Sequence, residues 1–154
     1  MLKKFLSIML IGCLSITMIG CGQKNVEGEL PDLMDKIYEG IDQANLPMML
    51  MNVEVTEENV EYYLGSSDIE FEEALASESA VGSIAYSVVL VRAKDNANIE
   101  ELKKEIKDNV NPAKWICVSV EEKNVIVDNI GDLVILIMSN DMGEELQTRF
   151  QNLK

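Results

Sequence analysis

The sequence predicts an α+β domain built on an antiparallel sheet of about four strands, with helices packed on it. Two runs, 84–91 and 133–138, are apolar almost throughout and rich in β-branched residues, as expected for strands covered on both faces. Two hairpins in one sheet form the simplest architecture for an order of strand, strand and helix that occurs twice. The expected elements are, in order, strand 69–75, strand 84–91, helix 99–110, strand 125–127, strand 133–138 and helix 142–153.

The amino-terminal segment has the three parts of a secretory signal peptide. Lys3 and Lys4 precede an uncharged apolar run over 5–20, and polar residues follow from Gly22 onward. As a helix, the run would reach about 24 Å, which is short of the hydrocarbon core of about 30 Å. Met18-Ile19-Gly20-Cys21 resembles the lipobox of bacterial lipoproteins. This implies that residues 1–20 are removed and that Cys21 is lipidated.

Two alternatives to this interpretation stay open. Leu10-Ile11-Gly12-Cys13 fits the same pattern, but cleavage there would leave the apolar stretch 14–20 on the mature protein. The segment could instead be an uncleaved anchor helix. We favour Cys21, and a lipoprotein carries two acyl chains, such as palmitate, which suit stable attachment to a membrane.

The mature chain divides into a short tether and one domain. Residues 21–29 are polar with two glycines, which is typical of a flexible tether, and 30–154 form a single domain. Pro31 opens an amphipathic helix that ends before Pro47. Because two strands are apolar on both faces, this helix is the candidate to cover the second face of the sheet. If it does not reach, that face would be a binding surface.

Three shorter segments are harder to assign. Residues 48–51 read Met-Met-Leu-Met, which would suit a soft ion such as Cu(I), but flexible side chains that fill a gap at the core edge are the preferred interpretation. Thr56 begins a short helix that stops at Gly65. Residues 115–120 fit either a strand or a buried turn, and within them Cys117 is expected to be a core residue and not a nucleophile.

Charge and composition exclude several classes of function. Removal of residues 1–20, which carry two lysines and no acid, changes the net charge from −14 to −16. A protein this acidic is repelled by nucleic acids and by anionic lipid headgroups, so we expect no nucleic-acid partner. The chain contains no histidine, which removes the usual general base and the commonest zinc ligand. We therefore expect no catalytic residues, no metal site and no cofactor.

The mature chain also resembles a known lipoprotein family. The stretches 83–91 and 125–137, with the charged helix that follows Asn98, are similar to the lipoproteins of domain of unknown function family 4358 in Firmicutes such as clostridia. The resemblance implies a domain on the outer face of the cytoplasmic membrane of a Gram-positive bacterium. It implies no activity and no catalytic residues, and only the lipobox cysteine, Cys21, is carried over.

We expect a non-catalytic binding module that recognises an unknown protein or envelope component and attaches to the membrane through the lipid on Cys21. One alternative is a small carboxylate-dependent hydrolase, which needs two acids that flank the scissile bond. A calcium-binding surface protein is the other, with oxygen-rich segments at 95–98 and 140–144 that lack EF-hand spacing. The acids available to a hydrolase are Glu72, Glu73, Glu78, Glu121, Glu122, Asp128 and Asp132.

Overall fold

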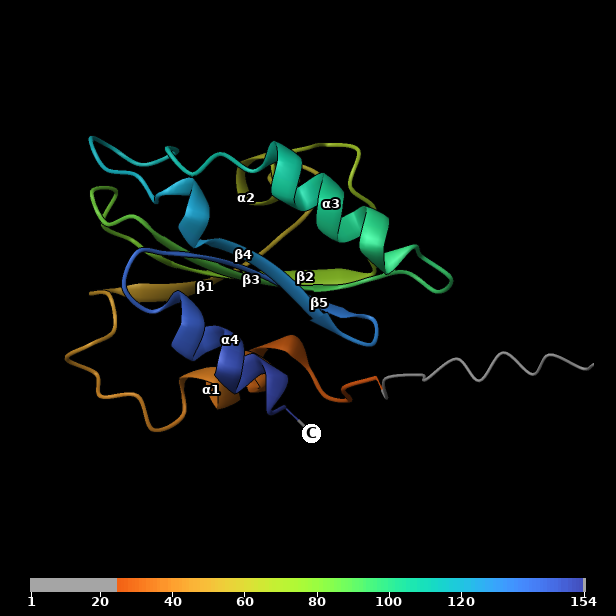
Figure 1. Ribbon diagram of the computed structural model, residues 1–154, viewed down its shortest axis with the longest axis horizontal. Helices are drawn as coiled ribbons and strands as arrows, with labels where there is room; N and C mark the ends of the chain where they lie inside the picture. Colours follow the sequence, from red (N-terminus) through yellow and green to blue (C-terminus); the bar gives the residue numbers. More distant parts are fainter. Residues whose placement is uncertain (1–24, 154) are drawn as a thin grey trace, which may run out of the picture.

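The computed structural model describes residues 25–153, and the expected signal peptide, Cys21 and the first part of the tether lie outside this range. An antiparallel sheet of five strands, in the order β1-β2-β3-β5-β4, lies between two layers of helices (Figure 1). The strands are β1 (Leu50–Glu54), β2 (Glu73–Ser79), β3 (Tyr86–Arg92), β4 (Val125–Ile130) and β5 (Leu133–Ser139). The helices are α1 (Leu30–Tyr38), α2 (Val60–Leu64), α3 (Ile99–Asn109) and α4 (Gly143–Gln151).

The two central strands are buried on both faces, as the sequence predicts. In β3, Val89 and Val91 point into one apolar layer, whereas Val88 and Leu90 point into the other. β5 alternates in the same way, and β3 and β5 pair along their full lengths. Since each buried aliphatic side chain contributes about 1.5–3 kcal/mol, these two strands form the centre of the domain.

Helices cover both faces of the sheet. On one face, Leu64 of α2 and Ile106 of α3 pack with Trp115 in the first layer. On the other face, Ile37 of α1 and Phe150 of α4 pack in the second layer. Figure 1 shows α2 and α3 on one side of the sheet and α1 and α4 on the other. The helices that follow the two hairpins, α3 and α4, thus lie on opposite faces.

The number of strands and the position of β2 differ from the prediction. The fifth strand, β1, lies at an edge of the sheet, and only Leu50 and Val53 of its residues are partly buried, so its sequence has no strong alternation. The strand expected over 69–75 begins at Glu73 and continues to Ser79. Its end reads Ser77-Glu78-Ser79, which is polar, yet all three residues are buried.

The amino-terminal part of the described chain is fixed at one end of the sheet. Arg92, the last residue of β3, donates hydrogen bonds to the carbonyl oxygens of Val26 (3.0 Å) and Gly28 (2.8 Å). The Arg92 guanidinium also pairs with Glu73 at 2.8 Å. Val26 itself is buried. Within 25–153, no helix is long and apolar enough to cross a bilayer.

Candidate interaction surface

The exposed large apolar side chains of the described residues gather around one end of the sheet, and we call them the apolar end. Three segments meet there: the residues before and within β1, the β2–β3 turn, and the loop after α3 (Figure 1). Ala80 donates a backbone hydrogen bond to the Met49 carbonyl (3.0 Å), and Ile116 donates one to the Gly82 carbonyl (2.8 Å). Tyr62 of α2 lies next to these segments, with its ring centre 4.2 Å from the Lys114 nitrogen. The residues are Met48, Met49, Met51, Tyr62, Ile116 and Val118, exposed by 68%, 65%, 51%, 48%, 69% and 37%.

Unusual backbone conformations turn these loops outward. Met49 has a φ of 55° and Cys117 a φ of 60°, both in the left-handed region that side chains other than glycine rarely adopt. Such conformations persist only where the surrounding structure holds them. The two residues lie in the two segments that present the apolar side chains, and Asn96, with a φ of 64°, lies in the connection before α3.

A buried ion pair lies beneath the apolar end. The ammonium of Lys114 contacts the Glu78 carboxylate, and their side chains are only 4% and 10% exposed. The Lys114 nitrogen also lies 4.2 Å from the ring centre of Tyr62 and 5.3 Å from that of Trp115. Burial lowers the pKa of Lys114, whereas the charge of Glu78 acts in the opposite direction. The pair therefore connects the 115–118 loop to the end of β2.

Tyr62 shares this environment. Its hydroxyl donates a hydrogen bond of 3.4 Å to Glu78. Partial burial, followed by the charge of Glu78, raises the pKa of Tyr62 to about 12. The phenol stays protonated at physiological pH and remains a donor to the carboxylate.

An acidic groove lies at the carboxyl end of β1. It has a volume of about 640 Å³, and Val55, Val60 and Ile69 contribute apolar atoms to its lining. Lys94 is the one basic residue that lines it. Its acidic residues are Glu54, Glu57, Asp68, Glu70 and Glu72. These side chains are exposed, so the groove presents a concentrated negative potential that favours a cationic partner.

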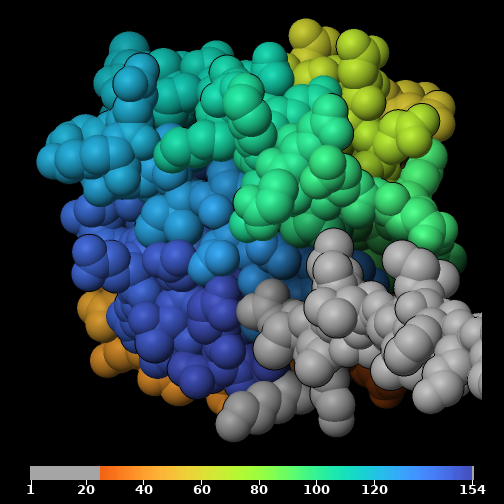
Figure 2. Space-filling view, turned by 45° about the vertical axis from the view of Figure 1, so that its right-hand side comes forward, coloured from red at the N-terminus to blue at the C-terminus, as the bar shows by residue number. Residues whose placement is uncertain are grey.

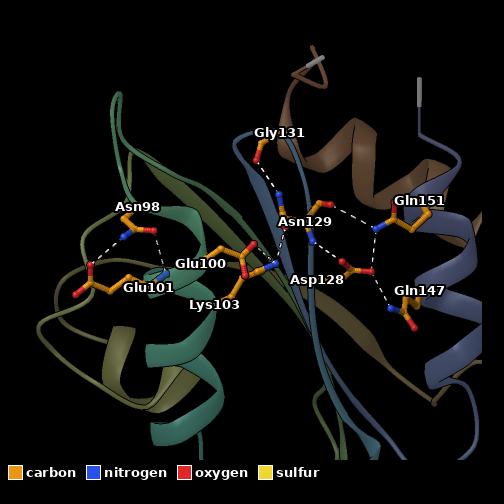
Figure 3. A network of polar contacts seen from close by, with 9 residues as sticks. All are labelled: Asn98, Glu100, Glu101, Lys103, Asp128, Asn129, Gly131, Gln147 and Gln151. Carbon is orange, nitrogen blue, oxygen red and sulfur yellow. Dashed lines mark hydrogen bonds and ion pairs between the residues drawn. The ribbon is translucent and has the colours of Figure 1, made fainter. Parts of the chain in front are cut away.

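The outer edge of β4 is covered by polar side chains, and β4 lies between α3 and α4 at the surface (Figure 2). Lys107 of α3 donates to the Val125 carbonyl, and Gln151 of α4 donates to the Asn129 carbonyl at 3.4 Å. Asp128 accepts from the backbone N–H of Asn129 (2.8 Å) and from Gln147 (2.7 Å) (Figure 3). Few backbone N–H and C=O groups on this edge of β4 therefore remain free to pair with another chain.

Asp128 is held in its charged form by this network. Burial alone would raise the pKa of Asp128, but hydrogen bonds from Gln147, the Asn129 N–H and Gln151 outweigh it and lower the pKa. Lys103 of α3 reaches the neighbouring Asn129 side chain at 2.8 Å (Figure 3). The carboxylate therefore has a structural role that joins α4 to β4.

The acids considered for catalysis lie in separate places. Glu73 pairs with Arg92, Glu78 with Lys114, and Asp128 binds the glutamines of α4. Glu72 lines the acidic groove, and Glu121 pairs with Lys123 at 2.7 Å on the surface. Asp132 also lies 3.8 Å from the Arg92 guanidinium, so Glu73 and Asp132 share one cation, whereas Glu78, Asp128 and Glu121 each bind other partners.

The segments considered for calcium are tied into the loops by hydrogen bonds. Asn98 caps α3 by accepting from the Glu101 N–H at 3.3 Å. Asn140 does not cap α4; its side chain accepts from the Glu121 N–H (2.9 Å) and donates to the Ser119 carbonyl (3.0 Å). In the part of the chain that the structure describes, no group of three or more His, Cys, Asp or Glu residues is placed to hold a metal ion.

Two expectations from the sequence are wrong at the apolar end. Cys117 is exposed and not a core residue, because the loop it occupies is irregular, with only Trp115 and Val120 buried. The methionines at 48, 49 and 51 do not fill a gap in the core, since each is more than half exposed. The role of Lys114 was not predicted. Its partner Glu78 is distant in sequence, and the only local signal is a lysine directly before the single tryptophan.

No protein-family model matches the chain, and no curated protein or solved structure resembles it closely enough to indicate a relationship.

Proposed function

We propose that the chain is a lipid-anchored extracytoplasmic protein that binds another protein or an envelope component and catalyses no reaction. The observation that carries this proposal is the apolar end itself. Six large apolar side chains stand exposed around a buried ion pair, at the opposite end of β3 from the segment that leads to Cys21. Exposed apolar residues in a group of this kind are typical of interaction sites.

The orientation of the domain supports a partner other than the lipid bilayer. Val26 and Gly28 are held by Arg92 at one end of β3, whereas the β2–β3 turn and Ile116 lie at the Tyr86 end. With the lipid on Cys21, the amino-terminal end of the domain would face the membrane and the apolar end would point away from it. The mature net charge of −16 also opposes contact with anionic headgroups.

The proposal includes the family and the finer description of the fold. We propose that the chain is related to the lipoproteins of family 4358. The support for this relation is the resemblance of the stretches 83–91 and 125–137. The units β2-β3-α3 and β4-β5-α4 would then be the repeated strand-strand-helix scaffold, and α1 the amino-terminal helix that completes the second layer. In this view the scaffold serves to hold the loops of the apolar end.

The anchor is tested by intact mass of the protein extracted from membranes. The wild type should have the mass of residues 21–154 with a diacylglyceryl group, and Cys21→Ala should lose this group completely because no thiol remains at the cleavage site. Cys13→Ala is the matched control and should keep the lipid. An unmodified mass that retains residues 1–20 would contradict the lipoprotein assignment and indicate a membrane helix.

Binding through the apolar end is tested with Ile116→Asp. The side chain is 69% exposed, so the change should leave the melting temperature unaltered. A charge at the centre of an apolar interface typically costs 2 kcal/mol or more, so cross-linking of the protein to its partner on intact cells should fall by at least about tenfold. Thr148→Asp, on the exposed side of α4, should cross-link as the wild type does. Equal yields in both variants would show that the partner does not use this surface.

A further inference from the structure

The two edges of the sheet differ in how their backbone groups are satisfied. On β4, a side chain from α3 binds the carbonyl group of Val125. Gln151 of α4 binds the carbonyl group of Asn129, and Asp128 binds the Asn129 N–H (Figure 3). Natural proteins commonly cover edge strands in this way, because an open edge pairs readily with another chain. β1, at the other edge, shows a different arrangement.

The register of β1 identifies its free groups. Ala80 donates to the Met49 carbonyl and Val55 donates to the Ala74 carbonyl, so the odd-numbered residues of β1 bond with β2. The backbone groups of Leu50, Asn52 and Glu54 therefore point away from the sheet. Within 25–153, the N–H groups of these three residues have no hydrogen-bond partner. Only the Glu54 carbonyl is used, as an acceptor for Asn59 at 3.1 Å.

The ends of this open edge have different chemistry. The strand starts beside Met48 and Met49 at the apolar end and finishes at Glu54, which lines the acidic groove. Methionine side chains adapt to varied apolar surfaces. Glu70 pairs with Lys94 at 3.3 Å, and the four other carboxylates of the groove favour a cationic group at the other end.

We propose that an extended segment of a partner protein adds to β1 as a sixth strand, with apolar residues beside Met48 and Met49 and lysine or arginine residues in the acidic groove. The mode is strand addition, in which main-chain hydrogen bonds supply affinity and the side chains at the two ends supply specificity. This inference rests on the proposed binding function and names its site and the class of its ligand.

A second copy of the chain fits the edge less well. Antiparallel pairing of β1 with β1 of another copy would rotate that copy by half a turn and place its Val26 end beside the apolar end of the first. Two copies anchored at Cys21 would then have their amino-terminal ends at opposite ends of the joined sheet, which does not suit an orientation in which both apolar ends point away from one membrane. Each mature copy would also carry the same net charge of −16.

The test uses the full-length, lipidated protein on intact cells, with a photo-crosslinking amino acid in place of Met51 and, separately, in place of Met49. In this background, Asn52→Pro removes an outward N–H without disturbing the bonds of β1 to β2, because the lost donor faces solvent. The adduct at position 51 should fall at least about tenfold, since one carbonyl of the added strand loses its donor. Asn52→Ala keeps the N–H and should cross-link as the wild type does.

The wild-type complex supplies a second measurement that does not depend on the folding of the proline variant. Amide hydrogen exchange at Leu50, Asn52 and Glu54 should be at least about tenfold slower in the cross-linked complex than in the free protein. The partner peptide identified by mass spectrometry should contain lysine or arginine next to an apolar run.

The outcomes separate this inference from the proposed function. Adducts at position 49 that persist in Asn52→Pro, without slower exchange at the three amides, would overturn strand addition while binding at the apolar end stands. An adduct with twice the mass of the chain would assign the edge to a second copy and overturn the proposed partner. Absence of any adduct at both positions would overturn the binding function as well, and the lipid mass at Cys21 would be unaffected.

Discussion

Gly65→Ala should lower the melting temperature of the domain by about 10 °C. Gly65 ends α2 with a φ of 91°, and a Cβ placed there would lie 2.3 Å from the backbone carbon of Asn109, at the end of α3. The left-handed conformation costs an alanine about 1–2 kcal/mol, and the contact with rigid backbone adds about 1–3 kcal/mol. Thermal unfolding followed by circular dichroism measures the effect.

Gly40→Ala is the matched control for this substitution. Gly40 also has a positive φ, 78°, but no atom lies within 4 Å of the position that its Cβ would occupy. Only the conformational cost of about 1–2 kcal/mol applies there. The difference between the two variants measures the close approach of α2 to α3. Equal melting temperatures would show that the two helix ends do not touch in solution.

Lys114→Ala should destabilise the domain by about 3–5 kcal/mol, because it leaves the Glu78 carboxylate buried without its partner. The side chains of the pair are 4% and 10% exposed, so the Glu78 carboxylate is largely removed from bulk water and relies on the lysine for its charge partner. Contacts of Lys114 with the rings of Tyr62 and Trp115 are lost as well. Urea unfolding measures the change in the free energy of unfolding.

Removal of the unpaired charge should restore stability. The double variant Lys114→Ala with Glu78→Gln carries no buried charge at this position, so we expect it to recover more than half of the loss. Lys104→Ala is the surface control, since its pair with Asp108 is exposed and exposed pairs contribute little to stability. A loss in Lys114→Ala no larger than that in Lys104→Ala would show that the pair is solvated in solution.

The fold class could be predicted from the sequence because its main signals are strong and local. The apolar runs that form β3 and β5 have no amphipathic alternative, and the stripe of Leu102 and Ile106 identifies α3. The sequence does not indicate β1, because an edge strand buries few side chains and therefore shows little alternation of apolar and polar residues. β2 was misplaced because its final residues are polar and become buried only through distant partners, such as Lys114 for Glu78 and the Met48 carbonyl for Ser79.

The candidate site could not be predicted for a related reason. Exposure of the methionines and of Cys117 follows from the paths of two loops, each with a residue of positive φ, and no sequence pattern marks these conformations. Cys117 lies within the apolar run 115–118, and the residues of such a run are more often buried than exposed, so the sequence predicts a core position for Cys117. The open edge of β1 can be identified only when the register of β1 with β2 is known. That register depends on pairing between residues that are remote in sequence.

The positions of α3 and α4 on opposite faces have a consequence for the relation between the two halves of the sheet. A rotation of half a turn about an axis normal to the sheet brings β4 and β5 onto β2 and β3, but it leaves α4 on the face opposite to that of α3. The two strand-strand-helix units therefore have opposite handedness, and no rigid rotation superposes them. Because a duplicated unit keeps its handedness, the placement of α3 and α4 on opposite faces does not fit duplication of one strand-strand-helix unit.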